Sequence, residues 1–171
     1  AQQRASRAEP RAGAVVRGRN KPIPALAPAG GVTLEVRPTF RWSEVEPGLD
    51  YRFTLKDEGD AVLLARTLRG TVVQLPPELV LAQGQRYRWS VSAQAPDGTA
   101  YGSTQRFTVA DAAIRADVEN FRPGQGASLG ERVAYSVWLE QSGLLDEARG
   151  YWQRLAAEGL NVPKEKLEAL R

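Results

Sequence analysis

The side chains that carry out most enzyme chemistry are absent from this sequence. Its 171 residues include no histidine, no cysteine and no methionine. These absences exclude disulfides, histidine and thiolate metal sites, Ser–His and Cys–His nucleophile pairs, and acid–base catalysis by histidine. Carboxylate chemistry and a Ser–Lys pair are what remains. We therefore expect a protein that is not an enzyme and that has no catalytic residues, no metal site and no cofactor.

Two groups of acidic residues are candidates for carboxylate chemistry. The stretch 57–60 (Asp-Glu-Gly-Asp) places a glycine between carboxylates, as calcium loops do at their sharp turn. It is too short to supply the roughly six oxygens that calcium needs, and it lies between two expected strands. We interpret it as a hairpin turn. Glu44 and Glu46 lie at the end of an expected strand, and a solvated loop explains them.

Basic residues offer a different chemistry, the binding of anions. Five of them occupy polar positions in segments where polar and apolar residues alternate, and no acidic residue shares their phase. They are Arg52, Lys56, Arg86, Arg88 and Arg106. Arginine binds carboxylates and phosphates through two parallel hydrogen bonds, so a surface that gathers these side chains would dock an acidic partner. A solvated face is the alternative interpretation.

The positive charge of the chain is concentrated near its N-terminal end. Residues 1–30 hold six cations and one acid, Glu9, for a net charge of +5, so the other 141 residues sum to −2 of the total +3. The cations are Arg4, Arg7, Arg11, Arg17, Arg19 and Lys21. The composition, rich in alanine, glycine and proline, predicts an extended arm that is either a solvated tether or a segment that orders on an acidic partner. Nucleic acid is not an expected partner, because the rest of the chain is negative and shows no recognition motif.

Apolar and polar residues alternate from about residue 32 to residue 109. The alternating apolar positions are Phe40, Trp42, Tyr51, Phe53, Leu55, Tyr87, Trp89, Val91, Ala93, Phe107 and Val109. This period of two predicts strands with one buried face and one solvated face. Turn residues separate the segments, most clearly in the stretch 95–99 (Ala-Pro-Asp-Gly-Thr). About six or seven short strands of this kind predict an antiparallel β-sandwich over residues 31–110.

Two of these segments resemble strands of a fibronectin type III module. Residues 81–93 have that family's pattern for its sixth strand: a leucine, a glycine-containing turn, and Tyr87 six residues after Leu81. Residues 38–42 (Pro-Thr-Phe-Arg-Trp) are similar to its second strand. Within residues 81–93 the chain departs from the family pattern at Gln83, where the family often has proline. The resemblance implies a Greek-key sandwich with Trp42 in its core and a tyrosine corner, in which the Tyr87 hydroxyl bonds to upstream backbone. It also implies that the third, sixth and seventh strands are neighbours, so that the five cations form one basic sheet face.

The pattern becomes helical over residues 111–171. Asp111 is an expected N-cap, residues 128–131 (Ser-Leu-Gly-Glu) form a capping box, and Gly143 ends the helix that the box begins. A further helix is expected over about 144–158 and a short one after Pro163. The stretch 143–152 resembles the middle of a tetratricopeptide repeat. A single repeat cannot bury a continuous core, so this helical hairpin must pack on the sandwich or on a partner.

These observations predict a mainly β chain with an α-helical region that serves as a non-catalytic accessory or scaffold subunit. We expect it to bind a protein partner in a bacterial membrane-associated complex through the arm and the basic face. The start Ala-Gln-Gln is typical of signal-peptidase cleavage, so we expect a periplasmic or otherwise exported protein, with the cytoplasm left open. Its apolar runs are too short to span a membrane. The alternatives are the ectodomain of a periplasmic sensor or regulator and a carbohydrate-binding module, which needs an exposed aromatic platform. Tyr101, Tyr135 and Tyr151 are aromatic residues that the strand pattern does not assign to the core.

Overall fold

The computed structural model describes residues 20–168, and these residues form nine strands and four helices. The expected arm residues Arg4, Arg7, Arg11, Arg17 and Arg19 lie outside the described residues. The strands are β1 (Lys21–Pro22), β2 (Ala25–Ala27), β3 (Val32–Thr33), β4 (Thr39–Trp42), β5 (Tyr51–Asp57), β6 (Val62–Leu68), β7 (Val72–Gln74), β8 (Arg86–Gln94) and β9 (Ala100–Val109). The helices are α1 (Ala112–Phe121), α2 (Leu129–Gln141), α3 (Leu145–Ala157) and α4 (Lys164–Glu168).

The strands form two sheets that pack as a β-sandwich. One sheet has the order β1-β9-β8-β5-β6, with β3 also paired to β9, and the other has the order β2-β4-β7. Because side chains alternate along each strand, the apolar positions of both sheets point into one shared core. The third, sixth and seventh strands of the fibronectin-like arrangement correspond to β5, β8 and β9, which are neighbours as expected. The predicted fibronectin III-like sandwich with C-terminal helices is confirmed.

The core is built largely from aromatic side chains. Trp89 is 0% exposed and Trp42 is 2% exposed, and the ring centroids of Phe40 and Phe53 lie 5.0 Å apart. The Tyr87 hydroxyl accepts a hydrogen bond from the backbone N–H of Ala82 at 2.8 Å. This bond is the predicted tyrosine corner. The assignment of both tryptophans to the core is also confirmed.

The structure corrects the expected boundary of the arm at residue 30. Residues 21–27 belong to the sandwich: β1 pairs in parallel with β9, and β2 pairs antiparallel with β4. Ile23 is 1% exposed, and the indole N–H of Trp89 donates to the carbonyl of Pro28 at 3.2 Å. Prolines are compatible with short edge strands because an edge leaves backbone groups unpaired. The last part of the expected arm therefore helps to close the sandwich core.

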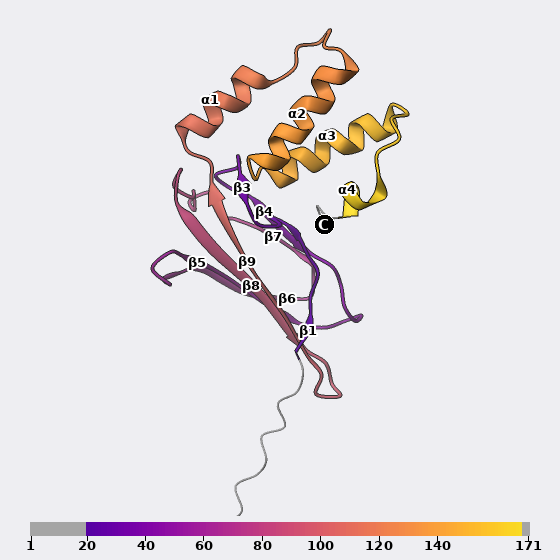
Figure 1. Ribbon diagram of the computed structural model, residues 1–171. Helices are drawn as coiled ribbons and strands as arrows, with labels where there is room; N and C mark the ends of the chain where they lie inside the picture. Colours follow the sequence, from indigo (N-terminus) through magenta and orange to yellow (C-terminus); the bar gives the residue numbers. More distant parts are fainter. Residues whose placement is uncertain (1–19, 169–171) are drawn as a thin grey trace, which may run out of the picture.

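The helices gather at one end of the sandwich (Figure 1). The predicted caps are present: the Asp111 side chain accepts from the N–H of Ile114 at 2.9 Å, and Ser128 and Glu131 form a capping box. Phe121 is 55% exposed, whereas Val118 in the same helix is 2% exposed. Helix α1 therefore buries Val118 and leaves Phe121, its last residue, at the surface. None of the helices within residues 20–168 has the length and hydropathy of a membrane-spanning helix.

The helices dock onto the sandwich through two glycines. The N–H of Val32 donates to the carbonyl of Gly143 at 2.8 Å, and Gly31 lies so close that a Cβ there would be 2.2 Å from the Gly143 oxygen. Both glycines have positive φ, +68° and +77°. Val32 and Leu34 pack against the buried side chains of the helices. The helical region therefore packs on the sandwich, one of the two outcomes that the sequence predicted.

Candidate anion-binding face

The register of the larger sheet brings three of the five predicted cations into one row. Lys56 on β5 lies opposite Arg88 on β8, and Arg88 lies opposite Arg106 on β9. We call these three residues the cation row. Side chains directly opposite each other have Cβ atoms about 4.5–5.5 Å apart, so the row places like charges next to one another. Such an arrangement costs stability unless anions lie nearby.

The other two predicted cations lie at different positions on the same face. Arg86 precedes Arg88 by two residues and is opposite Thr108, so it extends the positive region beyond the row. Arg52 is opposite Ser92, four residues along β5 from Lys56. At about 3.4 Å per residue this separation is roughly 14 Å. The structure therefore gathers Arg86 with the row and leaves Arg52 apart from it.

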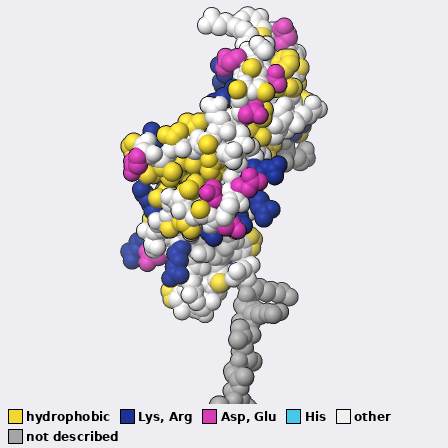
Figure 2. Space-filling model, turned by 90° about the vertical axis from the view of Figure 1, so that its left-hand side faces the viewer, with side chains coloured by type: hydrophobic (Ala, Val, Ile, Leu, Met, Phe, Trp, Pro, Cys, Tyr) yellow, Lys and Arg dark blue, Asp and Glu magenta, His cyan; other side chains and the backbone are white. Residues whose placement is uncertain are grey.

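A hollow of about 510 Å³ lies at the end of this sheet face that carries Arg86 and the cation row. Its lining includes Arg86, Arg88 and Arg106 together with acidic residues of the turn between β5 and β6. Side chains of both charge signs are interspersed on the side of the molecule that Figure 2 shows. The hollow thus combines fixed cations with carboxylates that belong to the chain itself.

No acidic residue shares the phase of these cations on the strands, but acidic residues of a neighbouring turn accompany them. The turn after β5 folds back over the start of β8, where Asp60 Oδ1 forms an ion pair with Arg88 Nη2. Glu58 Oε1 lies 3.9 Å from Arg86 Nη1. Among residues 20–168, neither Lys56 nor Arg106 has an ion pair. Within the described part of the chain, the row therefore has a neutralised centre and two cations at its ends without acidic partners.

The same turn confirms the hairpin interpretation of residues 57–60. β5 ends at Asp57 and β6 begins at Val62. The Asp57 carboxylate accepts the N–H of Ala61 at 2.9 Å, which is a local turn contact. In residues 20–168, no group of three or more acidic residues has the arrangement of a metal site.

The second acidic candidate, Glu46, has a structural contact. Its carboxylate accepts a hydrogen bond from the Tyr101 hydroxyl. This bond holds the proton on the phenol and raises the pKa of Tyr101 to about 12. Tyr101 is buried, so this pair closes one end of the sandwich and is not an open site.

A cleft that the sequence did not reveal lies between the smaller sheet and α3. Its volume is about 400 Å³, and Asp146, Glu147 and Arg149 line its helical side. Arg149 Nη1 donates to the carbonyl of Leu26 at 3.0 Å, so this side chain joins α3 to β2. Burial raises the pKa of both the Asp146 and the Glu147 carboxyl. The acids stand in the first turn of α3, where a helix favours negative charge, so their positions alone resemble ordinary helix signals.

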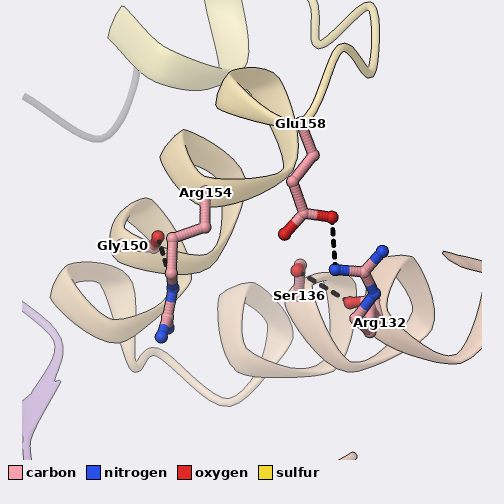
Figure 3. A network of polar contacts seen from close by, with 5 residues as sticks. All are labelled: Arg132, Ser136, Gly150, Arg154 and Glu158. Atoms are coloured by element: carbon pink, nitrogen blue, oxygen red, sulfur yellow. Dashed lines mark hydrogen bonds and ion pairs between the residues drawn. The ribbon is translucent and has the colours of Figure 1, made fainter. Parts of the chain in front are cut away.

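Polar contacts also join α2 to the end of α3 (Figure 3). Arg132 Nη1 on α2 donates to Glu158 Oε2 at 2.5 Å, while the Ser136 hydroxyl donates to the Arg132 carbonyl at 2.9 Å. Arg154 donates to the Gly150 carbonyl within α3 and places its guanidinium 4.1 Å from the Tyr151 ring centroid. Of these contacts, the pair between Arg132 and Glu158 joins the two helices, whereas the others lie within α2 or within α3.

An aromatic cluster lies on the outer side of the helices. The ring centroids of Phe121 and Trp138 are 5.0 Å apart, and those of Tyr135 and Tyr151 are 4.9 Å apart. Phe121, Tyr135 and Trp138 line a hollow of about 450 Å³. The partly exposed aromatic surface of the described residues is therefore on the helices, whereas the sandwich tryptophans are buried.

Comparisons with known proteins give only distant structural likenesses. No family model and no curated protein matches the chain. The solved structure of CopC from Methylosinus trichosporium OB3b is 15% identical, covers 52% of this chain and 93% of its own, and has a TM-score of 0.39. A fibronectin type III domain of human fibronectin type III domain containing protein 3 is 16% identical over 56% of this chain and 89% of its own, with a TM-score of 0.36. The assignment of the fold rests on the strand order described above.

Proposed function

We propose that this chain is a non-catalytic interaction module that binds an acidic protein partner through the outward face of β5, β8 and β9. The observation that carries the proposal is the cation row, in which Lys56, Arg88 and Arg106 lie opposite one another on adjacent strands. Carboxylates of a partner would relieve the repulsion within the row and pair with Lys56 and Arg106. The rigid sheet beneath holds the three side chains at fixed spacing, which favours recognition of a matching set of carboxylates.

The experiment measures binding of a fluorescein-labelled decaglutamate peptide by fluorescence anisotropy. Exposed charge pairs contribute about 0.2–1 kcal/mol each, so the double variant Lys56→Gln/Arg106→Gln should bind about two- to thirtyfold more weakly. Arg66→Gln is the matched control, since Arg66 is an exposed arginine on β6 of the same sheet and outside the row. Affinity should also fall as salt is raised, because screening weakens exposed contacts. Equal affinities of the wild type and the double variant would overturn the proposal.

The basic segment 1–19 is part of the proposed interface. It carries Arg4, Arg7, Arg11, Arg17 and Arg19, and Lys21 follows it on β1. Deleting residues 1–19 should lower the affinity for decaglutamate and leave the melting temperature of the remaining chain unchanged. An unchanged affinity would confine the interface to the sheet face.

The cellular setting remains a proposal built on this binding mode. We infer an accessory or scaffold subunit of a bacterial membrane-associated complex on the periplasmic side, or the ectodomain of a membrane-tethered regulator. The helical hairpin, whose stretch 143–152 resembles a tetratricopeptide repeat, would complete the fold and support the interface. Cell fractionation, followed by pull-down from native membranes with wild type and the row variant, tests this setting. Recovery of the same proteins by the wild type and by the row variant would contradict binding of such a complex through the cation row.

Carbohydrate binding is a second candidate, and the aromatic hollow on the helices favours it. Phe121 and Trp138 offer ring faces at the surface of this hollow. Titration with cellohexaose and maltohexaose, followed by tryptophan fluorescence, would detect stacking of sugar rings on Trp138. A response that Phe121→Ala abolishes would support this function, and no response at millimolar sugar would exclude these two glycans.

A further inference from the structure

The turn between β5 and β6 has an unusual backbone at the residue that pairs with the cation row. Asp60 has φ +66° and is the one residue other than glycine with positive φ among the residues 20–168. This left-handed conformation favours glycine and is tolerated by asparagine and aspartate. The N–H of Asp60 donates to the Asp57 carbonyl at 3.2 Å, so the turn fixes the backbone of Asp60. The chain thus places a carboxylate, and not the glycine that the backbone favours, next to Arg88.

The carboxylates of this turn are exposed to solvent, while Arg88, the partner of Asp60, is 32% exposed. Side chains of Asp60 and Glu58 are 66% and 63% exposed, and Arg86, which Glu58 approaches, is 76% exposed. Exposed ion pairs contribute little to stability and compete with water. The turn carboxylates can therefore leave the arginines at low cost when another anion arrives.

We propose that Asp60, assisted by Glu58, is an internal competitor that occupies the arginines of the cation row until the carboxylates of an acidic protein segment replace it. This inference rests on the function proposed above. Arg88 already accommodates a carboxylate in this structure, which identifies the chemical class of the partner group. The competitor lowers the affinity for weakly acidic segments, so a partner must present several carboxylates to bind.

The test compares Asp60→Asn with the wild type in binding fluorescein-labelled decaglutamate. Asparagine keeps the left-handed backbone and removes the charge. We expect the variant to bind about two- to fivefold more tightly, the value of one exposed ion pair. The matched control is Asp97→Asn in the turn at the other end of β8, which removes an equal charge from an exposed turn. Because the Asp97 turn lies farther from the cation row than the screening distance of about 10 Å, Asp97→Asn should bind decaglutamate with the affinity of the wild type.

Each outcome separates this inference from the proposed function. Binding by the wild type with no gain in Asp60→Asn overturns the competitor and leaves the binding face standing. Absence of binding by both proteins at low salt overturns the proposed function. A gain seen with phosphatidylglycerol vesicles and not with decaglutamate would make the partner an anionic lipid surface and overturn the acidic segment. If Asp60→Asn melts at a lower temperature, Asp60→Gly, which the backbone favours, provides the second variant for the same comparison.

Discussion

The inner and outer faces of β5, β8 and β9 differ in how their side chains find partners. On the inner face Phe53 and Trp89 are almost fully buried and contact other aromatic rings. On the outer face the cation row has a single close ion pair, which the neighbouring turn supplies. On the same strands, the inward residues are packed against other residues of the chain, whereas the outward cations can still bind a second molecule.

This difference indicates where stability and where binding reside. Burial of apolar surface is the main source of folding free energy, so the inner face determines whether the sandwich exists. Exposed charges contribute little to the free energy of folding, so the outer face is available to contribute to binding of a second molecule. Substitutions at adjacent positions on one strand should thus have opposite consequences, which makes the comparison directly testable.

The largest effect is expected for Trp89→Ala on the inner face. Truncation of a buried aromatic side chain costs about 3–5 kcal/mol, a large part of the stability of a small domain. The neighbouring substitution Arg88→Ala removes an outward side chain and should change the free energy of unfolding by less than about 1 kcal/mol. Urea denaturation followed by far-UV circular dichroism measures both. Similar losses in the two variants would contradict the assignment of these residues to different faces.

A smaller loss of stability is expected for Ala148→Leu. This substitution tests whether the helices are packed as tightly as the inner face of the sheet. Ala148 on α3 is fully buried, in a cluster that also contains Leu139 of α2. A leucine there should overpack the contact between the helices at a cost of about 1–3 kcal/mol. Ala116→Leu on an exposed position of α1 is the control for the substitution itself. An unchanged melting temperature of Ala148→Leu would show that α2 and α3 do not pack closely at this residue.

Most of the fold was predictable because its signals are local. Alternation of apolar residues specified the inner face of the sheet, and short motifs specified the tyrosine corner at Tyr87 and the helix caps at Asp111 and Ser128. Strands β1 and β2 were missed because they are two and three residues long, too short to show an alternation, and because the prolines around them are typical of an extended arm. Their pairing joins Lys21 to Tyr101, a contact between distant parts of the chain that no local pattern encodes.

The candidate site was predictable in its residue types and not in its geometry. Alternation indicated that Lys56, Arg88 and Arg106 point away from the core, but their alignment in one row depends on strand register. The ion pair between Asp60 and Arg88 was missed because it requires the hairpin turn to fold over a third strand. The buried acids of α3 were missed because only the docked helices reveal their surroundings.

The stability of the fold should also depend on pH through Glu147, a half-buried carboxyl in the first turn of α3. Burial and the nearby Asp146 and Glu35 raise its pKa above the ordinary value of 4.5. Its contribution to stability is therefore complete below that value and is lost as pH rises through the raised pKa of the folded state. Relative to Glu147→Gln, the wild type should lose stability as the pH rises above about 4.5, the ordinary pKa of a glutamate, and through the raised pKa of the folded state. Urea denaturation at a series of pH values measures this, and a constant difference would contradict the raised pKa.

The smallest effect on folding is expected for the outward residues that matter most for binding. Lys56 and Arg106 lie on either side of Arg88, whose charge Asp60 partly balances, and they have no ion pairs within residues 20–168. Lys56→Gln/Arg106→Gln should therefore leave the free energy of unfolding within about 0.5 kcal/mol of the wild type, or raise it slightly, since like charges directly opposite each other are destabilising. Urea denaturation at low and at high salt separates these contributions, because screening should remove any gain. A loss above about 1 kcal/mol would mean that the cations hold the sheet together, and the division between a stabilising inner face and a binding outer face would no longer stand.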